Sequence, residues 1–131
     1  MSAPLGWSLV EAADAIATCR ISSLELTEAA IAAAKAWQPT TNAFLDLRED
    51  EALDAARAAD AARGPKGPLH GVPLAHKDMY YRQGRVSTCG SIIRKEFSAP
   101  STATALARID QAGAIDLGTL NMAEWAGGAT G

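Results

Sequence analysis

Lys77 is the residue whose type and setting point most directly to chemistry. It follows the short apolar run 72–75 and precedes a long stretch, from Asp78 to about Pro100, that shows no regular pattern. Catalytic groups of α/β folds commonly lie at strand ends beside loops. A lysine acts as a general base only when it is neutral, so burial or nearby positive charge must lower its pKa from about 10.4 to about 7, at a cost of about 4 kcal/mol. An apolar strand ahead of the lysine would supply such burial.

The spacing alone leaves a plainer alternative open, in which Lys77 is a surface residue paired with Asp78. Two serines near it also carry hydroxyl groups that could react. Ser87 and Ser91 lie on the following loop, but neither sits in a G-x-S-x-G or a doubled-glycine serine motif. We expect both hydroxyls to hydrogen-bond the turn that contains them rather than to act as nucleophiles.

His70 and His76 are the two histidines of the chain. A Ser-His-Asp triad can be drawn with His76, yet His76 adjoins Lys77 in the expected strand and should point to the opposite face. We therefore expect His76 to pack or to support other groups. With no cysteine or paired acids close by, the two histidines make a poor metal site. The sequence predicts neither a metal ion nor a cofactor.

The elements that must position these groups begin with helices. Capping-box spacings at residues 8–11 and 22–25 predict the starts of two helices, and the second should run to about Trp37 and end at Pro39. The expected buried face of the first helix consists of Leu9, Ala13, Ile16, Ala17 and Arg20. A third helix is expected over 49–63. Its small-residue stripe permits close packing and consists of Ala52, Ala55, Ala56, Ala59 and Ala62.

The later elements belong to an α/β arrangement. Strands are expected at 42–47, 72–76 and 114–117, a helix capped by Ser101 and Thr102 at 103–112, and a strand-to-helix corner at 118–125. The segment 64–68 holds two Gly and two Pro, so it separates a mostly helical part, 1–63, from an α/β part, 64–131. Because further βα units normally continue a parallel strand pair, we expect residues 1–131 to be the N-terminal part of one larger domain.

The composition argues against several classes of function. Apolar residues make up 48% of the 131 residues, but many are alanine, so we expect a thin core. The net charge of −3 and the scattered basic residues argue against a nucleic-acid partner. The chain shows no signal peptide and no apolar run of membrane-spanning length, and its two cysteines are expected to be reduced thiols. The sequence thus predicts a cytoplasmic protein with no membrane partner.

The segment 67–78, which reads GPLHGVPLAHKD, resembles the catalytic-lysine segment of the amidase signature family. Further matches follow in the family's order: STCGS at 87–91, AGAIDLG at 112–118 and NMAEWA at 121–126, while ISSLEL at 21–26 is similar to the family's N-terminal helix start. The departures are Trp125, where Phe is usual, Thr102, where Asp is common, and Thr119–Leu120, where Lys-Thr is frequent. On these residues the chain is identified as a member of that family.

The resemblance implies an α/β fold in which a helical layer precedes the first strands of a mixed, helix-flanked sheet. It also implies amide-bond hydrolysis by a Ser–cis-Ser–Lys mechanism, in which Lys77 activates the nucleophilic serine through a middle serine. The family places both serines in a glycine- and serine-rich run after the residue that matches Gly131. We therefore expect residues 1–131 to supply the catalytic Lys77 and to be inactive alone, with a small-molecule amide as the substrate of the longer enzyme.

Two other functions stay open from the sequence. One is a non-catalytic binding or scaffolding module, in which an exposed core drives homodimer formation or association with another chain. The other is the amidase subunit of a tRNA-dependent amidotransferase, which shares these motifs. A basic surface facing tRNA would favour the amidotransferase, and this stretch of sequence does not show one convincingly.

Overall fold

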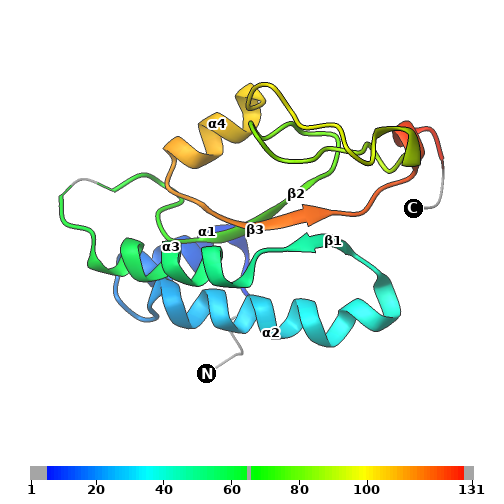
Figure 1. The fold of residues 1–131 in the computed structure, drawn as a ribbon. Coiled ribbons are helices and arrows are strands. Elements are labelled where there is room, and N and C mark those ends of the chain that lie inside the picture. Colours follow the sequence, from blue (N-terminus) through cyan, green and yellow to red (C-terminus); the bar gives the residue numbers. More distant parts are fainter. Residues whose placement is uncertain (1–5, 65, 129–131) are drawn as a thin grey trace.

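The computed structural model describes residues 6–64 and 66–128 (Figure 1). Its elements, in chain order, are α1 (Leu9–Ala17), α2 (Ser23–Thr41), β1 (Phe44–Leu47), α3 (Glu49–Ala61), β2 (Pro73–Lys77), η2 (Ile92–Arg94), α4 (Thr104–Gln111), β3 (Ile115–Leu120) and η3 (Glu124–Ala126). The α/β fold class expected from the sequence is confirmed. No helix in the described ranges is both long enough and apolar enough to cross a membrane.

The three strands form one mixed sheet in the order β1-β3-β2. The central strand β3 pairs in parallel with β2 and antiparallel with β1. Helices α1, α2 and α3 lie on one face of the sheet and α4 lies on the other (Figure 1). Because β2 and β3 are parallel, their carboxyl ends meet at the same edge, where Lys77 is the register partner of Leu120.

The main core lies between α2, α3 and β3. Two alanines of the expected small-residue stripe, Ala52 and Ala56, are buried against Ile31 of α2 and against Ile115 and Leu117 of β3. Their small size lets the two helices pack closely. The stripe is confirmed at its centre, whereas its outer members at positions 55 and 62 are exposed.

Both predicted capping boxes form. In α1, Glu11 N donates to Ser8 Oγ at 3.3 Å and Ser8 N donates to Glu11 Oε2 at 2.7 Å. In α2, Ser22 and Glu25 make the same reciprocal pair at 3.0 and 2.9 Å. Each box satisfies two backbone donors at a helix start, where a capping side chain typically contributes about 1 kcal/mol.

The buried face of α1 is rotated from the expected one. Ile16 is buried as predicted, but its buried neighbours are Ala12 and Ala15, and Leu9 is 47% exposed. Ala12 and Ile16 form a second core cluster with Leu26 and Val72. The expected face instead borders an open apolar groove beside the turn at 66–70.

The prediction that Pro39 ends α2 is wrong, because the helix continues to Thr41 with Pro39 inside its last turns. The chain leaves the helix at Asn42, which has the left-handed φ of 47° and donates its N–H to Gln38 O. The Gln38 side chain then pairs with both backbone groups of Phe44, at 2.9 and 2.8 Å. This side-chain pairing fixes the exit into β1 and holds the last turns in place around the proline.

Two boundaries in the second half also differ from prediction. Helix α4 has Ala103 as its N-cap, with no side-chain cap, because the Thr102 hydroxyl accepts from Gln83 N at 3.1 Å instead. Strand β3 extends to Leu120 rather than ending at position 117, since it pairs with strands on both sides. The corner after it is a short 3-10 turn.

Gly118 is a position where β1 and β3 approach too closely for a side chain. Its φ is +136°, and a Cβ there would lie 2.0 Å from Asp46 O. We predict that Gly118→Ala lowers the free energy of unfolding by at least about 2 kcal/mol, measured by urea denaturation. Gly6→Ala is the matched control because no atom lies within 4 Å of its added Cβ. Equal stability of the two variants would contradict the close approach.

Candidate active site

Lys77 is the last residue of β2, at the edge where the two parallel strands end. Its side chain is half-buried. Within residues 6–64 and 66–128, its ammonium group takes part in no hydrogen bond or ion pair. The expected position at a strand end beside a loop is therefore present, and the amine is left available to a further group.

Asp78 does not pair with Lys77, so the alternative of a surface Lys77–Asp78 pair is wrong. Asp78 is 2% exposed, and its carboxylate accepts from Thr88 N at 3.0 and 3.1 Å, from Gly90 N at 3.3 Å and from the Thr88 hydroxyl. A buried carboxylate needs such donors to offset its lost hydration. The side chain next to Lys77 therefore holds the turn at 88–90.

The two candidate serines are hydrogen-bonded inside the protein, but the prediction that both bond the turn that contains them is met only in part, because the Ser91 hydroxyl donates to Glu124 after β3. Ser87 Oγ donates to Asp78 O at 2.5 Å, and Ser91 Oγ donates to Glu124 Oε1 at 2.6 Å. Each serine is 2% exposed. Both hydroxyl protons are donated inside the protein and both side chains are buried, so neither serine has the exposed hydroxyl of a nucleophile.

The histidines lie in supporting positions. His70 Nε2 lies 2.9 Å from Ala59 O, and His76 Nδ1 lies 3.2 Å from Asp116 Oδ1. Burial acts to raise the pKa of Asp116, but the hydrogen bond with His76 and the charges of Arg82 and Arg48 outweigh it, so this pKa is lowered. In the part of the chain that the structure describes, no group of three or more His, Cys, Asp or Glu is placed to hold a metal ion.

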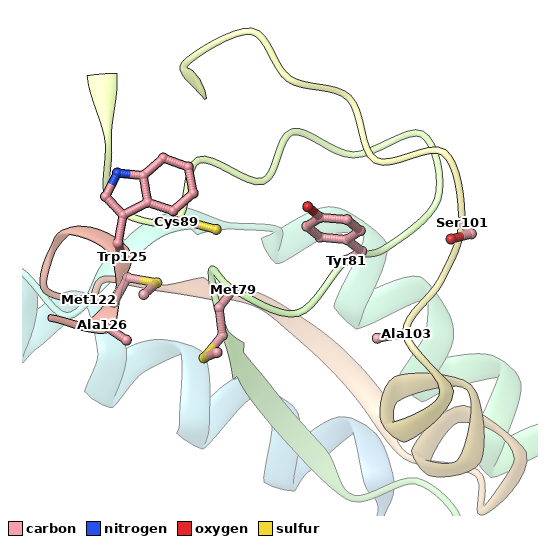
Figure 2. Close-up of a pocket in the computed structure, with 8 residues that line it drawn as sticks. All are labelled: Met79, Tyr81, Cys89, Ser101, Ala103, Met122, Trp125 and Ala126. Carbon is pink, nitrogen blue, oxygen red and sulfur yellow. The ribbon is translucent and has the colours of Figure 1, made fainter. Parts of the chain in front are cut away.

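A pocket of about 350 Å³ lies where the chain leaves β2 and β3 (Figure 2). We call it the strand-end pocket, and it is lined by Met79, Tyr81, Cys89, Ser101, Ala103, Met122, Trp125 and Ala126. Met79 comes two residues after Lys77. Non-glycine residues with left-handed φ gather at this pocket: Cys89 at 53°, Trp125 at 54° and Ala126 at 58°. Such strained backbone is concentrated at functional sites.

Sequence reasoning did not find this pocket. Its lining comes from segments that are distant in sequence and become neighbours through the sheet register and the turn held by Asp78. The one signal for it in the sequence is Trp125, which stands where Phe is usual.

Comparison with known proteins decides the family. The amidase family model matches residues 25–131. The chain belongs to the amidase signature family. The motifs at 67–78, 87–91, 112–118 and 121–126 all lie within the matched region.

Curated relatives and solved structures agree with this family. The A-subunit of glutamyl-tRNA(Gln) amidotransferase from Pseudomonas syringae is 43% identical over 92% of this chain and 26% of its own length, and that from Pseudomonas putida is 44% identical over 93% and 26%. The peptide amidase of Stenotrophomonas maltophilia is 30% identical with a TM-score of 0.82, over 93% of this chain and 26% of its own. The amidase-family chain thus spans about a quarter of the curated relatives it matches.

The Asp78 carboxylate organises the turn beside the lysine. We predict that Asp78→Asn lowers the free energy of unfolding by about 2–3 kcal/mol, because an amide cannot accept from all three neighbouring donors. Urea denaturation measures this loss. Asp54→Asn, which alters an exposed ion pair with Arg57, is the control and should change stability by less than about 0.5 kcal/mol. A neutral effect at Asp78 would refute its role in the turn.

The lowered pKa of Asp116 predicts a pH dependence of stability. Ionised Asp116 stabilises the fold above pH 3.8, its ordinary value, and this contribution is lost as the pH falls from there through the lower pKa of the folded state. Asp116→Asn should therefore lose less unfolding free energy than the unmodified chain between about pH 5 and pH 3. Urea titrations across this range test it, and parallel pH profiles for the two chains would be the contrary result.

Proposed function

We propose that this chain supplies the general base of an amide hydrolase and that Lys77 is that base. In the mechanism implied by the family, the neutral lysine takes a proton from a middle serine, which in turn activates the nucleophilic serine. Attack on the amide carbonyl forms an acyl-enzyme and releases the amine, and water then hydrolyses the acyl-enzyme. The substrate we propose is a small-molecule amide.

The observation that carries this proposal is the separation of Lys77 from Asp78. A lysine tied to the adjacent carboxylate would be a charged surface pair. Here Asp78 is buried and occupied by the turn at 88–90, while the lysine amine has no partner in the described ranges. Lys77 also ends a strand beside the strand-end pocket, which fits a base that meets its substrate there.

The two serines of the mechanism are proposed to lie outside this chain. Ser87 and Ser91 are engaged as donors to Asp78 O and Glu124. Residues 1–131 are therefore expected to contribute the base and part of the substrate pocket, while the nucleophile and the oxyanion hole come from the rest of a longer enzyme.

A second candidate is the amidase subunit of a tRNA-dependent amidotransferase. The observation that favours it is the 43% identity to the A-subunit of glutamyl-tRNA(Gln) amidotransferase. The two candidates differ in what activity requires: a free amidase hydrolyses small amides by itself, whereas an amidotransferase subunit works with partner subunits and an acceptor. Comparing small-amide hydrolysis by the purified full-length protein with and without an amidotransferase partner subunit separates them.

Replacing the proposed base tests the function. In the full-length enzyme that contains this chain, Lys77→Ala should lower kcat for a small amide by about 10³-fold, because proton transfer from the serine relay is lost. Lys35→Ala is the control, since Lys35 is an exposed partner of Glu49 and should leave kcat unchanged. A Lys77→Ala enzyme within about tenfold of the unmodified kcat would exclude Lys77 as the base.

The isolated chain provides a complementary test. Incubated with a fluorophosphonate that labels activated serines, residues 1–131 should acquire no covalent adduct by intact mass. Labelling that disappears in Ser87→Ala or Ser91→Ala would show a nucleophile inside this chain and overturn the assignment of both serines to a later segment.

A further inference from the structure

We propose that Arg94 is a positioning residue that fixes the walls of the strand-end pocket, and that this pocket takes an uncharged aromatic or apolar group of the amide substrate. This inference rests on the proposed function and specifies its substrate class.

Arg94 is a cation held by aromatic rings. Its guanidinium carbon lies 3.7 Å from the ring centroid of Phe97, 5.2 Å from that of Tyr81 and 5.6 Å from that of Trp125. Its Nη2 donates to Tyr81 Oη at 2.8 Å, and its Nη1 lies 3.7 Å from Cys89 Sγ. Among the described residues it forms no ion pair with an acid. The ring faces therefore supply the electrostatic partner of its charge.

The contacts of Arg94 join three separate walls of the pocket. Tyr81 comes from the chain after β2, Cys89 from the turn held by Asp78, and Trp125 from the chain after β3. Arg94 is not itself a lining residue. It therefore acts on the pocket through these three side chains, by holding them in one mutual arrangement.

The pocket's chemistry selects an uncharged apolar group. Two methionines, a thiol and two aromatic rings dominate the lining, and Figure 2 shows Trp125 and Tyr81 on opposite sides of Met79 and Cys89. Methionine side chains adapt to apolar shapes and make favourable contacts with aromatic rings. A volume of about 350 Å³ accommodates a phenyl-sized group. The charge of Arg94 behind the wall disfavours a cationic ligand.

The pocket lies near Lys77, so a substrate with its apolar group in the pocket can place its amide near the lysine. Met79 lies two residues beyond Lys77, and Met122 lies two residues beyond its register partner Leu120. A substrate whose apolar group fills the pocket thus has its remaining atoms at the edge where the lysine lies. Phenylacetamide, a neutral aromatic amide, is a suitable probe of both features.

Trp125 can report binding directly. With Trp7→Phe and Trp37→Phe in the 131-residue chain, Trp125 is the single tryptophan. Phenylacetamide should change its fluorescence in a saturable way. Acetamide, which has the amide without the ring, and benzylamine, which has the ring with a positive charge, should each bind at least about tenfold more weakly. Equal responses to all three compounds would overturn the substrate class.

The positioning role is tested in the same background. Arg94→Met should weaken phenylacetamide binding by about tenfold, and Arg94→Lys should restore part of it, because lysine keeps the charge over the rings but cannot donate to two groups in fixed directions. Arg57→Met, at an exposed arginine, is the control. Unchanged affinity in Arg94→Met, or an Arg94→Lys chain that is folded by circular dichroism yet no better than Arg94→Met, would overturn the role.

A Lys77→Ala substitution separates this inference from the proposed function. It should leave phenylacetamide binding to the single-tryptophan chain within about twofold, since the pocket walls do not include Lys77. If binding is absent while Lys77→Ala abolishes turnover in the full-length enzyme, the pocket assignment fails and the base assignment stands. If binding is present while turnover survives Lys77→Ala, the base assignment fails instead.

Discussion

The buried carboxylate of Asp78 is the interaction on which the site depends. Once removed from water it requires several donors, and they come from the turn at 88–90. That turn carries Cys89 in a left-handed conformation, and Cys89 O accepts the Trp125 N–H at 2.9 Å. Hydrogen bonds from the turn to the buried Asp78 carboxylate, and from Trp125 to the turn, thus connect the loop after β2 to the segment after β3. The pocket forms between these two segments.

The engagement of Asp78 by the turn also means that Lys77 and Arg94, two cations near the pocket, are not paired with this carboxylate. Because Asp78 is engaged by the turn, Lys77 has no counter-ion at the strand end among the residues that the structure describes. Arg94 is stabilised differently, by three ring faces rather than by a carboxylate. We propose distinct roles for these two cations: proton transfer for Lys77, and the shape of the strand-end pocket for Arg94.

Local sequence signals predicted the parts of the fold that depend on neighbours in the chain. Both capping boxes, the centre of the alanine stripe and the position of Lys77 at a strand end are of this kind. The continuation of α2 past Pro39 was not predictable from the proline, because it depends on Gln38 pairing with Phe44 across the helix exit. The ring contacts of Arg94 were likewise not predictable from the sequence, because the sheet and the turn bring together residues that are distant in the chain.

We propose that Lys77 serves a serine relay beside the strand-end pocket. A crystal structure of the full-length enzyme, with its nucleophilic serine acylated by a phenylacetyl group, tests this most directly. We expect Lys77 Nζ at about 3 Å from a serine hydroxyl of the relay, with the phenyl ring between Trp125 and Met79. A lysine amine out of hydrogen-bonding reach of every serine, with the ring bound elsewhere, would contradict both the role of Lys77 and that of the pocket.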